Sequence, residues 1–207
     1  EDGTVHIPGF YDDVVQPTEI EKAIYDKLPD VRENLFRSYG AYPIYPADKG
    51  YYIQLNGTPS FNISGISSGY TGNGTETVLT SKAIAKIDMR LVAAQDGKQY
   101  IKKLGYDNVE VICHGITEPA KTPVDTPYLL PVEKATRNVF GPYMVYPNRP
   151  STAPDYLWTN ILGLPTIQVR WCDATSDNHA PNEHLTLSNY IKGTELTATV
   201  LKEISEM

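Results

Sequence analysis

The densest group of chemically active side chains lies near the end of the chain, in the run SDNHAPNEHL from Ser176 to Leu185. Loops that join strands to helices on an α/β scaffold commonly carry functional groups. His179 is the strongest candidate there, because imidazole binds metal ions and carries protons near neutral pH. The residues alone leave a second interpretation open, in which His179 is a surface or capping residue of a polar loop.

A zinc finger is not predicted, although His179 and His184 are five residues apart, which is a spacing found in half of such a motif. The chain has no Cys-x-x-Cys pair, and Pro181 breaks any helix between the two histidines. A metal ion needs about three or four protein ligands, and the spacing of the four histidines does not complete a site. If His179 binds a metal, the other ligands must come from polypeptide outside this sequence.

The elements that must position these residues change in character near residue 115. Before it, helices are predicted at residues 17–28 and 31–38, and the stretch that follows to residue 56 shows little regular pattern. The run KAIAKIDMRLV, which begins at Lys82, alternates with period 2 and predicts a half-buried antiparallel strand. Its buried face would hold Ala83, Ala85, Ile87, Met89 and Leu91. Residues 108–114 (NVEVICH) predict another strand.

After residue 115 the pattern predicts helices that alternate with apolar strands, which is typical of an α/β sheet layer. The helices are expected at residues 130–139, 155–162 and 187–204, and the strands at 143–146 and 165–171. In the last helix, one apolar stripe is predicted to pack against the core; it contains Ile191, Thr194, Ala198, Leu201 and Ile204.

Composition excludes several classes of partner. The formal net charge of −7 argues against nucleic-acid binding, which needs concentrated Lys and Arg. No apolar run approaches the roughly 20 residues that span a bilayer, so no membrane partner is expected. Cys113 and Cys172 lie in apolar strand-like runs and are expected to be buried free thiols, which favours a reducing, cytoplasmic setting.

Several segments resemble one known family. HAPNE followed by an amphipathic helix is similar to the C-terminal ligand motif of the M20 metallopeptidases. PGFYDDV, PSFNISGISSGYTGNGTETVLTSKAIAKIDMRLVAAQD and NRPSTAP resemble segments of its carnosinase-like branch, in the same order. The resemblance covers nearly the whole chain and implies the C-terminal half of such an enzyme. Residues 1–115 would be the later part of an α+β lid, or dimerisation, domain, and residues 116–207 the C-terminal segment of a two-piece α/β catalytic domain.

The resemblance also implies an activity. Family members hydrolyse the amide bond of dipeptides or short peptides that carry a free C-terminal carboxylate, using water activated by two metal ions. The ions would be Zn²⁺, with Mn²⁺ or Co²⁺ as alternatives, and the enzyme would be a homodimer joined through its lid domain. The general base and the remaining metal ligands would come from the missing N-terminal half, so no catalytic residue is expected in this chain.

Four positions match functional positions of the family. His179 matches the last metal ligand, and Arg90 matches an arginine that grips the substrate carboxylate. Thr77 matches a residue that lines the substrate site, in some members from the neighbouring subunit, and the loop of Ser151 also holds the carboxylate. The branch usually has a Gly-Gly pair where this chain has Arg149 and Pro150, which implies a reshaped pocket.

The residues themselves allow simpler interpretations of these positions. Arg90 could be a solvent-exposed strand residue, Thr77 an ordinary strand residue, and Ser151 or Thr152 the N-cap of a helix. Two other functions also remain open for the chain. One is an N-acyl-amino-acid deacylase of the acetylornithine deacetylase or desuccinylase type, whose substrates also present a carboxylate. The other is a truncated, non-catalytic fragment used for dimerisation or binding.

Overall fold

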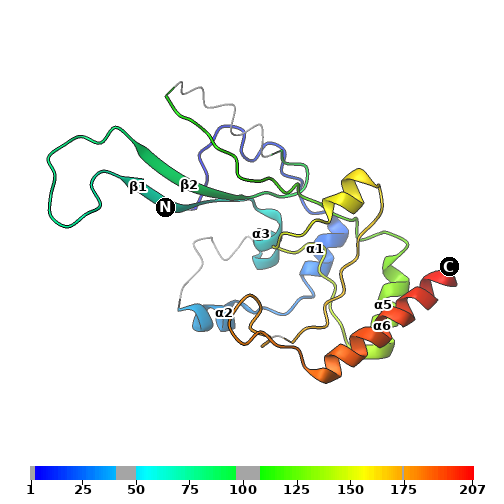
Figure 1. The fold of residues 1–207 in the computed structure, drawn as a ribbon. Helices are drawn as coiled ribbons and strands as arrows, with labels where there is room; N and C mark the ends of the chain where they lie inside the picture. The colour runs from blue at the N-terminus through cyan, green and yellow to red at the C-terminus, as the bar shows by residue number, and fades with distance from the viewer. Residues whose placement is uncertain (1–2, 41–49, 97–107, 174) are drawn as a thin grey trace. The chain divides into compact units, whose positions relative to one another are not determined.

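The computed structural model describes residues 3–40, 50–96, 108–173 and 175–207 (Figure 1). The described part of the chain combines helices with one antiparallel strand pair. Its elements are α1 (Glu19–Tyr25), α2 (Arg32–Tyr39), α3 (Tyr51–Gly57), β1 (Ser60–Ser68), β2 (Ala83–Arg90), α5 (Leu129–Phe140), the π-helix η2 (Leu157–Ile161) and α6 (Leu187–Ser205). None of the helices in these ranges is long and apolar enough to cross a membrane.

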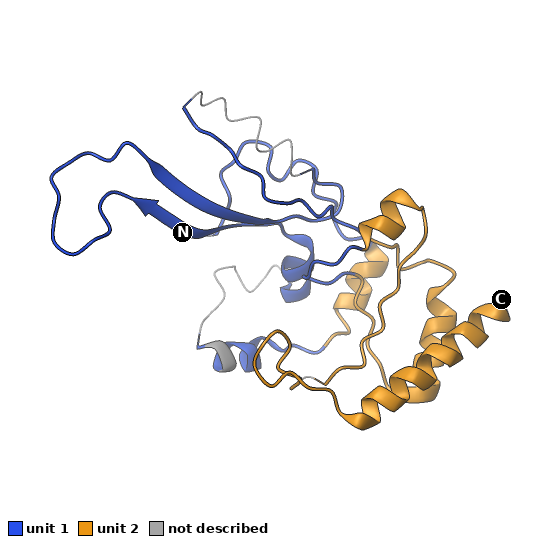
Figure 2. Cartoon of the chain, viewed as in Figure 1, with its two compact units in different colours: residues 1–18, 29–120, 148–154 blue, residues 19–28, 121–147, 155–207 orange. Residues whose placement is uncertain are grey.

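The chain divides into two compact units, which we describe separately (Figure 2). Unit 1 contains residues 1–18, 29–120 and 148–154, and therefore holds α2, α3, β1 and β2. Unit 2 contains residues 19–28, 121–147 and 155–207, and holds α1, α5, η2 and α6. The assignment of residues 1–115 to a lid domain and 116–207 to a catalytic domain stays a prediction.

In unit 1, β1 and β2 form an antiparallel hairpin in which Ser60 pairs with Arg90 and Ser68 with Ala83. The strand predicted from Lys82 onward is confirmed as β2, because its period-2 pattern is a local property of the sequence. Its predicted half-burial is wrong for the described chain. Ala83, Ala85 and Ile87 are exposed, and Met89 is the one partly buried residue of β2.

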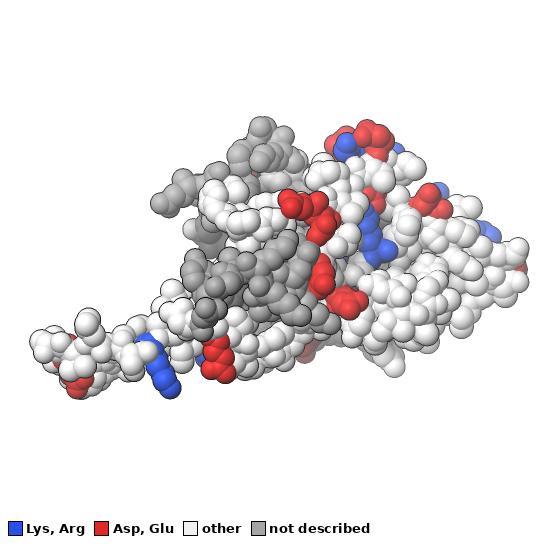
Figure 3. Space-filling model, turned by 90° about the horizontal axis from the view of Figure 1, so that it is seen from above, with Lys and Arg blue, Asp and Glu red and all other residues white. Residues whose placement is uncertain are grey.

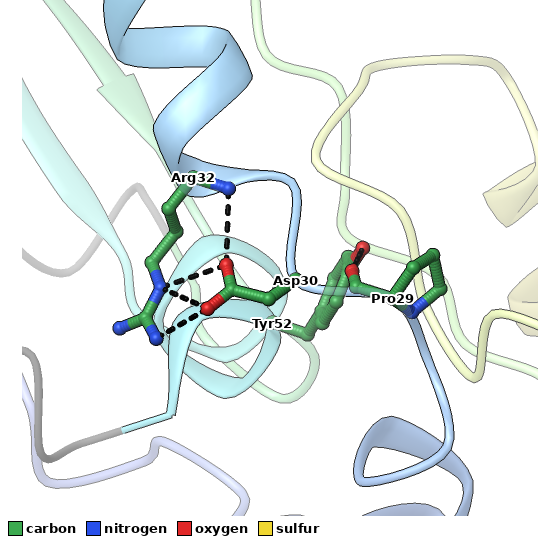
Figure 4. Close-up of polar contacts among 4 residues, drawn as sticks. All are labelled: Pro29, Asp30, Arg32 and Tyr52. Carbon is green, nitrogen blue, oxygen red and sulfur yellow. Dashed lines mark hydrogen bonds and ion pairs between the residues drawn. The ribbon is translucent and has the colours of Figure 1, made fainter.

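Two contacts show how α2 and α3 are held in unit 1 (Figure 4). The Tyr52 hydroxyl of α3 donates to the carbonyl of Pro29 at 2.7 Å, and Tyr52 is buried. Asp30 accepts the backbone N–H of Arg32 at 3.0 Å and also binds the Arg32 guanidinium, with Nη2 and Oδ2 2.6 Å apart. These hydrogen bonds lower the pKa of Asp30 to about 2. Helix α3 lies in the stretch where the sequence pattern predicted little regular structure.

In unit 2, the two long helices predicted near residues 130–139 and 187–204 are confirmed as α5 and α6, and they pack on each other. Ala135 of α5 and Leu196 of α6 are almost completely buried. Lys134 Nζ lies 2.5 Å from a carboxylate oxygen of Glu203, and this hydrogen bond raises the pKa of Lys134. The ion pair joins α5 to α6, with the Lys134 side chain 59% exposed and the Glu203 side chain 11% exposed.

The predicted packing face of α6 is wrong. Of the predicted stripe, Ile191 and Leu201 are 57% and 66% exposed, whereas Gly193 and Leu196 are buried. The Trp171 ring lies against this buried face, and a Cβ added at Gly193 would lie 2.8 Å from it. Only a residue without a side chain allows so close an approach.

Three predicted strands, at residues 108–114, 143–146 and 165–171, are not strands in the structure. A strand is stabilised by hydrogen bonds to a neighbour, and no described segment pairs with these. Cys113, in the first of these runs, and Cys172, directly after the last, are exposed free thiols and not buried ones. The helix predicted at 155–162 is reduced to η2, and the chain leaves it at Gly163 with a φ of +66°.

Candidate functional site

Arg90 stands at the end of β2 with its guanidinium held by two neighbours in unit 1. Its Nε donates to Asp88 at 2.9 Å, since residues two apart in a strand share one face. Its Nη1 donates to the Thr152 hydroxyl at 3.0 Å. The Arg90 side chain remains 60% exposed. The guanidinium is thus oriented while part of its five-donor fork stays open to a ligand.

The segment 148–154, which contains Ser151, is anchored on both sides of that serine. The Asn148 side-chain amide donates to the carbonyl of Asn56 at 3.0 Å, and Asn148 Oδ1 accepts the N–H of Arg149. Thr152 is anchored by Arg90. Ser151 lies between these anchors and is exposed. The structure therefore brings the Ser151 loop to Arg90, and the contact is made by Thr152.

Thr152 was missed as a site residue because sequence reasoning offered it only as a possible helix N-cap. In the structure the next helical element, η2, begins after Tyr156, so neither Ser151 nor Thr152 caps it. A Thr beside the family's Ser position, with an Arg elsewhere on the polar face of a strand, is the one available signal. That signal does not reveal which hydroxyl meets the guanidinium.

Thr77 is not brought to Arg90. It is an exposed residue of segment 69–82, which joins β1 to β2 and has no regular structure. This segment extends beyond the end of the hairpin opposite Arg90 (Figure 1). The eight residues of β2 span about 24 Å at roughly 3.4 Å per residue. Thr77 and Arg90 of one chain therefore do not face a common ligand.

His179 lies in unit 2, on a loop that turns back on itself before α6. The His184 N–H donates to the carbonyl of Ser176 at 2.9 Å, and the Ala180 N–H donates to that of Asp177 at 2.8 Å. His179 is exposed and has a φ of +63°, in the left-handed region that few L-residues adopt. Within the described chain no hydrogen bond holds its ring.

His179 fits a metal ion as a single ligand. An exposed neutral imidazole is a good donor for Zn²⁺ and similar ions. Among the described residues, however, no three His, Cys, Asp or Glu side chains are grouped so that they could hold an ion. The described chain therefore offers one ligand where a protein site needs about three or four.

Basic side chains do not gather into a patch on the one face that Figure 3 shows. On the face shown in Figure 3, described Lys and Arg side chains stand apart from one another among acidic and uncharged residues. A guanidinium such as that of Arg90, already paired with Asp88, recognises a carboxylate by direct hydrogen bonds more than by long-range attraction. The Arg90 guanidinium therefore offers donors whose geometry suits a small planar anion.

Comparisons with known proteins agree on one family. No protein-family model matches the chain. The chain is 27% identical to the Cys-Gly metallodipeptidase of Schizosaccharomyces pombe, over 99% of this chain and 46% of that protein. It is 26% identical to the human Beta-Ala-His dipeptidase, over 99% and 43%. A solved M20 family metallo-carboxypeptidase from Sulfolobus solfataricus superposes with a TM-score of 0.86 and 31% identity, over 99% of this chain and 49% of that one.

The chain has the fold of about half of an M20 metallopeptidase, and this confirms the mixed α/β fold class. Its similarity to these dipeptidases and to the M20 family metallo-carboxypeptidase confirms the family resemblance seen in the sequence. The chain spans about half the length of the curated relatives it matches. Similarity alone therefore does not transfer the activity of those complete proteins to it.

Proposed function

We propose that the chain is the C-terminal part of a metal-dependent hydrolase that cleaves dipeptides or short peptides with a free C-terminal carboxylate. The observation that carries this proposal is the Arg90 guanidinium held beside the Ser151 loop by Thr152. A forked, oriented guanidinium matches a carboxylate in geometry as well as in charge. Arg90 and Ser151 would bind the substrate carboxylate, and the anchored loop would keep the two in register.

His179 would supply one ligand of a site for two divalent ions, Zn²⁺ or, alternatively, Mn²⁺ or Co²⁺. When bound, the ions would supply a water nucleophile that is active near neutral pH. The remaining ligands and the general base would come from a preceding half of the same enzyme. His179 suits this role because its ring is exposed at a loop and its nitrogens are not used within the described chain.

Thr77 would serve the site of a second copy in a homodimer that forms through the lid domain. Its place beyond the opposite end of the hairpin from Arg90 supports this assignment, because it cannot line the site of its own chain. We also propose a cytoplasmic setting, as the sequence predicts from its two free cysteines.

Two measurements on the isolated 207-residue chain test the need for a missing half. We expect no stoichiometric zinc by metal analysis and no hydrolysis of a dipeptide, because one imidazole does not make a metal site. Tight stoichiometric zinc together with turnover would overturn this part of the proposal.

Substrate class is tested in the enzyme that contains this chain. A dipeptide with a free carboxylate should be cleaved much faster than the same dipeptide with a C-terminal amide, because the amide cannot accept both guanidinium hydrogen bonds. Equal rates for the two would remove the carboxylate from recognition. Faster cleavage of an N-acetyl amino acid than of any dipeptide would instead select the deacylase function.

A further inference from the structure

Asp173 connects the start of the His179 loop to the start of α6. Its Oδ2 accepts the backbone N–H of Thr186 at 2.9 Å. Its Oδ1 accepts the Thr186 hydroxyl at 3.2 Å and the side-chain amide of Asn189 at 2.8 Å. Thr186 is the N-cap of α6, and its own side chain makes no capping hydrogen bond. The carboxylate of a residue thirteen positions earlier therefore anchors this helix end.

The same residue closes the loop. The carbonyl of Asp173 accepts the N–H of Ser176, a buried residue whose own carbonyl accepts the N–H of His184. Asp173 and these two backbone bonds hold together the ends of the segment that presents His179. Inside that segment Asp177, His179 and Asn182 all have positive φ. Such a backbone is disfavoured for L-residues and persists only where its surroundings impose it.

We infer that Asp173 is a positioning residue that fixes the His179 imidazole by holding its loop closed against the N-terminus of α6. The inference rests on the proposed function, in which His179 is a metal ligand. Asp173 is not itself proposed as a metal ligand. Asp173 acts through Thr186 and Asn189, and the left-handed turn at His179 follows from the closure.

The carboxylate is essential to this role because all three groups that hydrogen-bond to the Asp173 side chain are donors. An ionised Asp is an acceptor at both oxygens. In an Asp173→Asn variant the amide NH₂ would have to replace an oxygen facing a donor, whichever way the amide turned. At least one hydrogen bond would be lost with almost no change in shape, and the attraction of a carboxylate to a helix N-terminus would be lost as well.

Amide hydrogen exchange in the 207-residue chain tests this inference, with Asp177→Asn as the matched control. Asp177 lies in the same loop, loses the same charge on substitution, and engages no described partner through its side chain. In Asp173→Asn we expect the protection of the His184 N–H to fall by about tenfold or more, as for loss of a hydrogen bond to a charged group. The protection of the Leu196 N–H, in the middle of α6, should fall by much less. The control should change neither.

A second measurement reports on the mobility of the His179 ring itself, through the NMR order parameter of its Cε1–Hε1 bond. We expect the ring to become more mobile in Asp173→Asn and not in Asp177→Asn. Asn189→Ala removes one of the three side-chain bonds and should give a weaker change of the same pattern, which keeps the test available if Asp173→Asn fails to fold. Equal loss of protection at His184 and Leu196 would show a merely structural helix cap. That result, unchanged His184 protection or an unaffected ring would each overturn the inference.

The two proposals fail separately. If His184 exchange shows the closed loop but His179→Ala leaves the metal content of the enzyme unchanged, Asp173 holds the loop and His179 is not a ligand. If His179→Ala removes metal but Asp173→Asn leaves the loop and ring unchanged, the metal assignment stands and the positioning role of Asp173 does not.

Discussion

The hydroxyl that meets the Arg90 guanidinium belongs to Thr152, with Nη1 and Oγ1 3.0 Å apart. Thr152→Val keeps the shape of this side chain and removes the acceptor. On the proposed function, we expect the KM for a dipeptide to rise by about three- to tenfold with little change in kcat, since one hydrogen bond to a charged group is lost. Steady-state kinetics of the enzyme that contains this chain would measure it. An unchanged KM would show that Thr152 does not orient Arg90 for binding.

Arg90→Lys replaces a planar fork with a single ammonium. It loses the Nε bond to Asp88 and the ability to bind a carboxylate through two parallel hydrogen bonds. We expect kcat/KM for a free-carboxylate dipeptide to fall by about 10- to 100-fold, the equivalent of about 1.5–3 kcal/mol. The C-terminally amidated dipeptide is the control, and its slower cleavage should change little. A similar loss for both substrates would place the defect in folding.

Gly193→Ala should destabilise unit 2, although Ala favours helices more than Gly does. The new Cβ would lie 2.8 Å from the Trp171 ring, and overpacking of this kind costs about 1–3 kcal/mol against a helix gain of about 1 kcal/mol. Urea unfolding followed by Trp fluorescence measures the result, because Trp158 and Trp171 both lie in unit 2. Thr194→Ala, at the next and exposed position, should be neutral or slightly stabilising. Equal effects of the two substitutions would contradict the close contact.

Lys121→Met should lower the free energy of unfolding of unit 2 by about 2–3 kcal/mol. Lys121 Nζ lies 2.7 Å from Glu21 Oε1, and the Glu21 side chain is 3% exposed. Removal of the cation leaves a carboxylate in a site that water barely reaches. The double variant Lys121→Met with Glu21→Gln should recover much of the loss, and the same fluorescence measurement decides this. No recovery would mean that packing of the Lys121 stem is what stabilises.

Asp30 gives unit 1 a pH dependence whose sign is fixed. Its pKa in the folded chain is about 2, below the ordinary 3.8. The largest cause is the hydrogen bond from the Arg32 side chain. A depressed pKa contributes stability that is fully present above the unfolded value and is lost as pH falls from about 4 to about 2. Carboxyl ¹³C NMR should give a midpoint near 2. In Arg32→Met the midpoint should move up toward 3.8, and a midpoint already at 3.8 in the native chain would contradict the ion pair.

Local elements could be predicted from the sequence because their determinants are local. The helical spacing in residues 130–139 and 187–204 and the alternation from Lys82 each correspond to an observed element. The pairs that depend on distant residues could not be predicted in this way. The burial of Gly193 against Trp171 joins positions 22 residues apart, and nothing in the α6 pattern reveals it. The predicted strands at 108–114 and 165–171 failed because an apolar run does not supply its own neighbour.

The residues of the candidate site divide in the same way, into those that the sequence could select and those that it could not. Arg90 and the Ser151 loop could be selected by resemblance, and the structure places them together within unit 1. Thr152 and Asp173 could not, because each acts through a geometry that spacing does not encode. Asp173 meets Thr186 and Asn189 only after the loop between them has turned back. His179 was identified by its residue type, and the positive φ at that position became visible only with coordinates.

The β1–β2 hairpin has a practical consequence for handling the isolated chain. In the described residues these two strands pair only with each other, so the outward N–H and C=O groups of both are open to another strand. Ile63, Ile66 and Ile84 on the same ribbon are each more than half exposed. Open strand edges with apolar side chains promote aggregation. Preparations of this fragment should therefore form oligomers and precipitate as the concentration rises, and dilute samples will be needed for the measurements above.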